Sequence, residues 1–260
     1  MTAAFKQNKY EFMKRRILVY NIAYGTGSTG SVHNRLLTAH RYLKTNGEHF
    51  EKISDFIESS NADIVGLVEA DAGSYRTGYH NQIADLAARL KHYHFGSVKY
   101  GENSFSRNIP ILNKQSNALL TRDLSVESKL HFLSRGMKKL VIEVDINNVK
   151  VFVVHLSLRK AVRDRQLTLL ADLIPSNTPV IVAGDFNTMS GSEELEDFML
   201  ETGLINPNRA ELPTYPAWKP KKQLDYLLHS REIVPEYFAV PQVDYSDHLP
   251  LIMDFKVKKR

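Results

Sequence analysis

The sequence predicts an α/β fold in which apolar β-strands form a two-layer core and helices pack on the outside. Strand-length apolar runs alternate along the chain with segments whose apolar residues recur at helical spacing. Two neighbouring runs are joined by a tight turn, so part of the strand pairing is expected to be antiparallel. The 260 residues contain no internal repeat, no low-complexity segment and no long Pro- or Gly-rich linker, which favours a single domain.

The first half of the chain alternates between strands and helices. Phe50, Ile53 and Ile57 share one face of a helical pattern, and Ile83 and Leu86 lie on one side of a second. The β-branched and apolar runs between these patterns are typical of buried strands. The elements expected here are strands over 16–22, 63–70 and 116–123 and helices over 47–60 and 81–93.

The second half begins with a predicted hairpin over 139–158, whose turn is Asn147-Asn148. Asparagine tolerates the positive φ that a tight turn requires. Ser190 and Glu193 have the spacing of a capping box at the start of a helix, and Gly203 is suited to end it. The elements expected in this half are the hairpin, helices over 159–174 and 190–203, and strands over 178–187, 222–230 and 248–255.

Composition limits the classes of function. The net charge is +5, from 34 basic and 29 acidic residues, which is a mild bias toward anionic partners. The absence of cysteine excludes disulfides, zinc–thiolate sites and a thiol nucleophile. No apolar run approaches the length of a membrane span, and the N-terminus lacks the apolar core of a secretory signal. We therefore expect a cytoplasmic protein, with a domain over 13–260 and a loose leader over 1–12.

Polar residues stand where the apolar strands begin or end. Each residue alone has an ordinary explanation, such as an Asx turn or a core histidine bonded to a carbonyl group. Six such segments in one chain indicate a site instead, because strand ends and their loops can aim several side chains at one point. The residues concerned are Asn21, Glu69, His155, Asp185 with Asn187, Asp225, and Asp247 with His248.

Part of this set matches the requirements of a magnesium site. Asn and carboxylate side chains supply hard oxygen ligands, and no thiolate competes for zinc. Mg²⁺ usually takes one or two carboxylates, keeps several waters and binds substrate phosphate. Glu69 with Asp247, and with Asn21 nearby, meets that description.

The remaining polar residues match the needs of phosphoester hydrolysis, which requires a base for water, donors for the developing negative charge and a proton for the leaving oxygen. Asp185 and the histidines can serve as base. Asn187 and a protonated His155 or His248 can hold negative charge. Asp225 is suited to fix the tautomer of His248, as the carboxylate does in a hydrolase triad.

The chain resembles the endonuclease/exonuclease/phosphatase superfamily, which includes deoxyribonuclease I, exonuclease III-like AP endonucleases, sphingomyelinases and inositol-polyphosphate 5-phosphatases. The resemblance covers nearly the whole chain and points to a bacterial branch of the group. It implies a four-layer α/β sandwich, with two packed mixed β-sheets flanked by helices. It is carried, in order, by "VYNIAYG", "DIVGLVEAD", "SNALLTR", "VVHLSL", "VAGDFNT", "QLDYLL" and "YSDHLPL".

The resemblance also implies a role for each matching residue. Asn117 lies in a segment that the family places near its site. Val68 departs from the family pattern, which has Gln before the metal-binding Glu. The "HL" histidine, in place of a tyrosine, is more similar to the deoxyribonuclease I, sphingomyelinase and phosphatase branches. The implied catalytic residues are His155, Asp185, Asn187, Asp225 and His248, and the implied metal-site residues are Asn21, Glu69 and Asp247.

The expected activity is Mg²⁺-dependent phosphoester hydrolysis, with Mn²⁺ as a substitute metal. The substrate is expected to be nucleic acid, a nucleotide, or a phospholipid or sugar-phosphate head group, with no obligate protein partner. A nuclease acting on DNA or RNA is an alternative, supported by the basic cluster that begins at Arg159; an inactive binding protein on the same fold is another. Trp218, in the 213–222 loop, is a candidate substrate contact beside Arg159 and Asn117, and the 25–45 segment is either a substrate wall or a surface loop.

Overall fold

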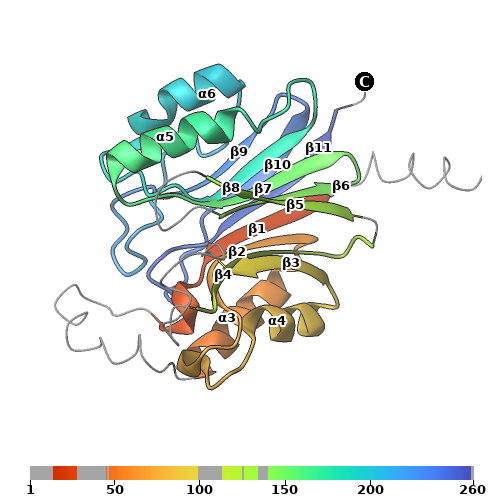
Figure 1. Ribbon diagram of the computed structural model, residues 1–260, viewed down its shortest axis with the longest axis vertical. Coiled ribbons are helices and arrows are strands. Elements are labelled where there is room, and N and C mark those ends of the chain that lie inside the picture. The colour runs from red at the N-terminus through yellow and green to blue at the C-terminus, as the bar shows by residue number, and fades with distance from the viewer. Residues whose placement is uncertain are drawn as a thin grey trace, which may run out of the picture.

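The computed structural model describes residues 14–27, 45, 47–98, 113–124, 126–133 and 140–258. Two β-sheets pack face to face at its centre, with strand orders β10-β11-β1-β2-β4-β3 and β5-β6-β7-β8-β9 (Figure 1). The first sheet contains β1 (Arg15–Asn21), β2 (Ile64–Asp71), β3 (Tyr93–Val98), β4 (Gln115–Thr121), β10 (Ile233–Ala239) and β11 (Leu251–Val257). The second contains β5 (Val126–Phe132), β6 (Leu140–Ile146), β7 (Val149–His155), β8 (Val180–Asp185) and β9 (Asp225–His229).

Helices cover the outer face of each sheet, so the predicted four-layer sandwich is confirmed (Figure 1). The first sheet carries α3 (Gly47–Ser60) and α4 (Gln82–Leu90). The second carries α5 (Lys160–Ala171) and α6 (Glu196–Thr202). Short 3₁₀ turns η1 (Ala23–Gly25), η3 (Tyr75–Thr77) and η5 (Ser192–Leu195) follow β1, β2 and β8. No helix in the described ranges is both long enough and apolar enough to cross a membrane.

The inner core lies between the two sheets. Val19 of β1 and Val153 of β7 belong to one buried cluster that joins the sheets, and both are at most 1% exposed. The helices bury separate clusters on the outer faces, with Ile53 of α3 on the first sheet and Leu170 of α5 on the second. Burial of this apolar surface is the main favourable contribution to folding.

The strand directions bring the polar strand ends to one region. β1 runs parallel to β2, and β7 runs parallel to β8, so the carboxyl ends of each pair meet at one edge. His155 is paired with Asp185 in this register. β9 is antiparallel to β8 and begins at Asp225, which lies opposite Asp185. The sheet topology thus gathers these residues without help from side-chain contacts.

The predicted turn at Asn147-Asn148 is confirmed, with φ of 52° and 65° at the two residues. Gly203 ends its helix in the left-handed conformation, with φ of 68°, as expected. The predicted helix over 190–203 is wrong in its first part, which is the 3₁₀ turn η5 followed by the short helix α6.

The capping box is also wrong. The N-cap of η5 is Gly191, and no side chain caps this turn; the Ser190 amide donates instead to Oε1 of Glu194, within the turn, at 2.8 Å. Strands β3, β5 and β10 were not among the elements expected from the sequence. The 1–12 leader and most of the 25–45 segment lie outside the described residues.

Candidate active site

The carboxylate of Asp185 is the centre of the candidate site. It lies at the end of β8 and is 2% exposed. Its Oδ2 atom is 3.1 Å from Asn21 Nδ2, which donates a hydrogen bond from the other sheet. The same oxygen is 3.3 Å from Nε2 of His155, the last residue of β7. Asp185 therefore joins side chains from both sheets at one point.

Asn21 is held in its orientation by local structure. Its Oδ1 accepts a hydrogen bond from the Ala23 amide at 3.1 Å, and its carbonyl oxygen accepts one from the Ser246 hydroxyl at 2.7 Å. The first contact turns the amide nitrogen toward Asp185. The second fastens the segment just before Asp247 and His248 to the end of β1.

Glu69 reaches the site from a distorted part of β2. The pairing of β2 with β4 shifts register between Leu67 and Ala70, and Glu69 has φ of 57°, which is uncommon for a residue other than glycine. Its Oε1 lies 3.8 Å from His155 Nε2, and its side chain is 20% exposed. Asn117 supports this bulge, because its Oδ1 accepts a hydrogen bond from the Glu69 amide at 3.3 Å.

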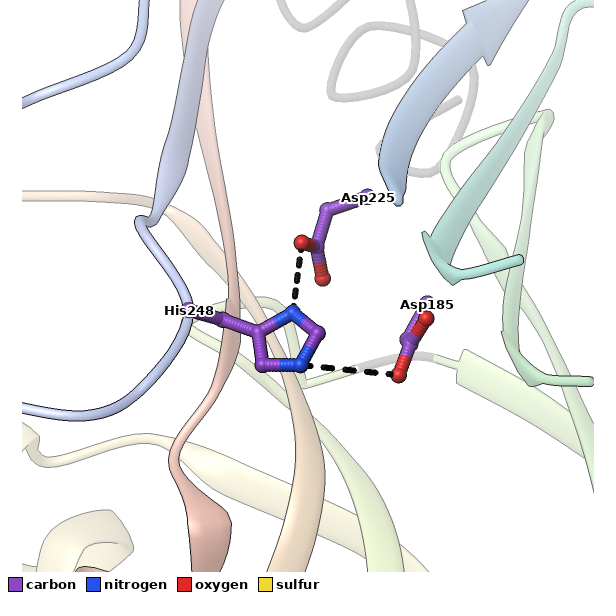
Figure 2. A group of neighbouring side chains, drawn as sticks. All are labelled: Asp185, Asp225 and His248. Atoms are coloured by element: carbon purple, nitrogen blue, oxygen red, sulfur yellow. Dashed lines mark hydrogen bonds and ion pairs between the residues drawn. The ribbon is translucent and has the colours of Figure 1, made fainter. Parts of the chain in front are cut away.

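Asp225 and His248 are both buried, and their side chains point toward each other (Figure 2). Asp225 Oδ2 lies 2.7 Å from His248 Nδ1, and His248 Nε2 lies 4.0 Å from Asp185 Oδ2. An ionised carboxylate only accepts hydrogen bonds, so Nδ1 carries a proton and Nε2 faces Asp185. The contact between His248 and Asp225 expected from the sequence is present.

The electrostatics of this pair favour a charged imidazole. Burial opposes the charge on His248, but the neighbouring carboxylates of Asp225 and Asp185 outweigh it and raise the pKa of His248 to about 10. Burial also raises the pKa of Asp225, so both shifts favour an added proton on the Asp225–His248 pair in the metal-free protein. A protonated imidazole can donate to a phosphate oxygen or to a leaving group.

Asn187 is fixed beside Asp185. Its amide donates to Asp185 Oδ1 at 2.9 Å, and its φ is 55°. This is the Asx turn that the sequence also allowed, and it restrains the carboxylate through its second oxygen. Asn187 Nδ2 donates to the Leu156 carbonyl at 3.0 Å, which ties the turn to the end of β7.

The other predicted site residues take different positions. Asp247 is half-buried beside His248, and its charge is one of those that raise the pKa of His248. Trp218 is half-buried in the 213–222 loop, and Arg159 is exposed at the start of α5; both lie outside the contacts described above.

The sequence reading missed a threonine of the 213–222 loop. Thr214 is fully buried, and its hydroxyl donates to Asp225 Oδ2 at 2.7 Å. Nothing in its sequence pattern marks this residue, because the contact depends on how the loop folds back on β9. The next residue, Tyr215, packs its ring against the His248 ring with centroids 4.9 Å apart.

The donor set fits a divalent cation. The titratable groups named above are the carboxylates of Glu69, Asp185, Asp225 and Asp247 and the imidazoles of His155 and His248. Carboxylates outnumber imidazoles in a mostly buried region, which favours a cation, and hard oxygen ligands suit Mg²⁺ or Mn²⁺. Ligand atoms of Asp185, Asp225 and His248 also lie within 4.8 Å of one another. The hydrogen bond that joins His248 to Asp225 already occupies the facing atoms of these two, which makes that group less suited to a metal.

Comparison with known proteins agrees with this geometry. The model of the Endonuclease/Exonuclease/phosphatase family matches residues 18–248. "Uncharacterized protein YbhP" of Escherichia coli (strain K12) is 26% identical over 223 residues, covering 77% of this chain and 85% of that protein.

Two solved structures share the fold. The human Nocturnin catalytic domain with bound sulfate anion has a TM-score of 0.67 at 17% identity, covering 97% of this chain and 99% of that one. The mannosyl-6-phosphatase of Bacteroides thetaiotaomicron has a TM-score of 0.65 at 15% identity, covering 93% and 99%. Since the family model spans most of the sequence, the chain belongs to the endonuclease/exonuclease/phosphatase family, whose members are phosphoesterases and nucleases.

Proposed function

We propose that this protein is a metal-dependent phosphoesterase that uses an activated water molecule. The observation that carries the proposal is the convergence on Asp185 of Asn21 from one sheet and His155 from the other, with His248 Nε2 4.0 Å away. A carboxylate surrounded by donors and protonated imidazole suits attack of water on phosphorus. An inactive binding protein would have no need of this buried arrangement, because buried charges are costly to keep.

Each side chain of the site has a separate role in hydrolysis. Asp185 takes the proton of the attacking water, and its orientation is set by hydrogen bonds to both of its oxygens. His155 and Asn187 hold the phosphate oxygens as negative charge develops. His248, protonated and held by Asp225, donates to the phosphate or to the leaving oxygen.

Glu69 and Asp247 would hold the metal, which we propose to be Mg²⁺ with Mn²⁺ as a substitute. Asn21, which the resemblance places at the metal, lies beside them and acts through Asp185, because its Nδ2 donates to that carboxylate and its Oδ1 accepts from the Ala23 amide. When bound, such an ion would neutralise phosphate charge and polarise the phosphorus–oxygen bond. Glu69 is suited to this task because its carboxylate, only 20% exposed, is presented beside His155 by the bulge of β2. The strained backbone at Glu69 is consistent with a functional position.

The substrate class is a phosphoester. The solved relatives include a mannosyl-6-phosphatase and a catalytic domain that binds sulfate, an anion with the shape of phosphate. We favour a phosphodiester or a small phosphomonoester over a long nucleic acid. Of the basic cluster that supported a nuclease, Arg163 is buried and paired with Glu194, so it cannot track a nucleic-acid backbone. A cytoplasmic location and a single domain over 13–260 stay predictions from the sequence.

The test uses bis-(p-nitrophenyl) phosphate and p-nitrophenyl phosphate with added Mg²⁺ or Mn²⁺. Asp185→Asn and His248→Gln should each lower kcat by at least about 100-fold, because each removes a proton-transfer group. Asp164→Asn, on the exposed face of α5, is the matched control and should retain activity. Wild-type turnover in Asp185→Asn would overturn the assignment of the base.

Metal dependence is tested in the same assay. EDTA should abolish turnover, and Mg²⁺ or Mn²⁺ should restore it. Glu69→Gln should raise the metal concentration needed for half-maximal activity. Turnover that persists in EDTA would remove Glu69 and Asp247 from the proposed metal site. No hydrolysis across DNA, RNA, nucleotide, phospholipid and sugar-phosphate substrates, with metal present, would favour the inactive binding protein.

A further inference from the structure

The hydroxyl of Thr214 has all of its hydrogen-bonding capacity in use. It accepts from the Leu224 amide at 3.0 Å and from the Asp225 amide at 3.1 Å, and it lies 2.7 Å from Asp225 Oδ2. A hydroxyl offers one donor and two lone pairs. Because backbone amides can only donate, both lone pairs are taken and the hydrogen must point to Asp225.

The same carboxylate oxygen receives a second hydrogen bond. Asp225 Oδ2 is 2.7 Å from His248 Nδ1 as well as from Thr214 Oγ1, while Oδ1 is buried and has no hydrogen-bond partner in the described part of the chain. The terminal torsion of an aspartate is broad and does not fix its own angle. Thr214 supplies the contact that holds the plane of this carboxylate toward the imidazole.

The backbone around Thr214 is bonded to both sides of His248. The Thr214 carbonyl accepts from the Leu249 amide at 2.8 Å, and the Asp247 carbonyl accepts from the Ala217 amide at 2.9 Å. The Thr214 amide donates to the Lys222 carbonyl at 2.8 Å, just before β9. The 214–217 segment therefore joins the start of β9 to the segment that carries the histidine.

We infer that Thr214 is a positioning residue for the candidate active site, which holds Asp225 so that Asp225 in turn orients His248. Thr214 does not touch the reacting atoms and acts through the carboxylate. The inference concerns the geometry of the pair, and its effect on catalysis rests on the proposed function. The first residues of the 213–222 loop therefore position the Asp225–His248 pair. This role is separate from any contact that Trp218 makes with substrate.

The first test compares three variants. Thr214→Val keeps the shape of the side chain and removes the hydroxyl, and Thr214→Ser keeps the hydroxyl. Thr121→Val is the matched control: Thr121 is also fully buried, its hydroxyl accepts one hydrogen bond from the Asp123 amide, and it pairs with Ile64 at the opposite end of β2 from Glu69.

For phosphoester hydrolysis we expect Thr214→Val to lower kcat by about 10- to 100-fold with KM within about twofold, as is usual for residues that support a reactive side chain. Thr214→Ser should recover kcat to within a few-fold of the wild type, and Thr121→Val should leave it unchanged. Wild-type kcat in a folded Thr214→Val would overturn the inference. If Thr214→Val does not fold, the test uses Thr214→Ala in its place, because alanine also removes the hydroxyl and leaves a smaller side chain.

A second readout does not need turnover. The proton on His248 Nδ1 can be followed by NMR in protein with ¹⁵N-labelled histidine, and its signal is assigned by its loss in His248→Gln. Thr214→Val should shift or broaden this signal, while Thr214→Ser and Thr121→Val should preserve it. A preserved signal in Thr214→Val would overturn the inference. A Thr214-dependent signal in a protein that hydrolyses no phosphoester would uphold the inference and reject the proposed function.

Discussion

Arg163 of α5 offers a sharp test of the structure, because its guanidinium is buried and multiply bonded. It is 1% exposed and pairs with Glu194 through Nε and Nη2. Its Nη1 donates to the carbonyls of Ser157 at 2.7 Å and Leu158 at 3.1 Å. The side chain thus fastens the loop after His155 to the turn that precedes α6.

The perturbation is Arg163→Met, which keeps most of the volume and removes the charge. It leaves the Glu194 side chain, 2% exposed, without its cation, and it removes the hydrogen-bond donor of two carbonyl groups. Breaking a buried pair from one side costs about 3–5 kcal/mol. At about 2–4 °C per kcal/mol for a chain of this size, the melting temperature should fall by roughly 10 °C.

Urea denaturation followed by circular dichroism measures the change. Lys160→Met on the same helix is the control, because its ion pair with Asp164 is exposed and should contribute less than about 0.5 kcal/mol. The double variant Arg163→Met/Glu194→Met should be less destabilised than Arg163→Met alone, since no charge is then left buried. An unfolding free energy for Arg163→Met within about 1 kcal/mol of the wild type would refute this reasoning.

Three further perturbations test other parts of the molecule. Asp254→Asn should lower the unfolding free energy at pH 7 by about 1.5 kcal/mol, since it weakens charge-assisted hydrogen bonds with Arg16. The Arg16 hydrogen bond lowers the pKa of Asp254, so this stability is present above the ordinary carboxyl pKa and lost as the pH falls through the folded value; urea titrations from pH 7 to 3 should show a shallower decline in the variant. Gly184→Ala should yield no stable fold by limited proteolysis, because φ is 139° and the added Cβ would lie 2.0 Å from the Val154 carbonyl oxygen; a soluble, protease-resistant variant would contradict this. Asp225→Asn should lower kcat of phosphoester hydrolysis by about 10³- to 10⁴-fold, because a neutral amide no longer stabilises and orients the charged imidazole of His248, and unchanged turnover would rule that role out.

The sequence predicted the parts of the fold that depend on local pattern. The turn at Asn147-Asn148 follows from two residues that tolerate positive φ, and its position sets the register of β6 with β7. The strand ends were predictable because a run of apolar residues stops where the side chains must become polar. This second signal was enough to mark Asn21, His155 and Asp185 as members of one site.

The missed strands carry weak patterns because they lie at sheet edges. β10 contains Pro235, which argues against a central strand, and its pairing with β11 shifts register between Pro235 and Tyr237. β5 alternates polar and apolar residues and leaves Leu130 and Phe132 exposed. An edge strand has one neighbour only, so tertiary pairing decides its conformation.

Long-range side-chain contacts were beyond the reach of sequence pattern. Arg163 belongs to the basic cluster that begins at Arg159 and supported a nuclease, yet its partner Glu194 lies 31 residues away in another turn. Thr214 bonds to Asp225, which lies 11 positions further along the chain. Such contacts depend on how two loops fold over the sheet. An arginine or a threonine in the sequence does not by itself indicate which distant residue it will contact.

The position of β1 between β11 and β2 has a consequence for biosynthesis. In a chain made from its N-terminus, β1 is synthesised early, but the strand that covers its open edge spans Leu251–Val257. Until Leu251–Val257 has been synthesised, one edge of this apolar strand stays unpaired, and the preceding Ser246 hydroxyl does not yet bond to the Asn21 carbonyl. The first sheet and the candidate site should therefore form together, once β11 is available to pair with β1, and the uncovered edge of β1 is open to aggregation before that.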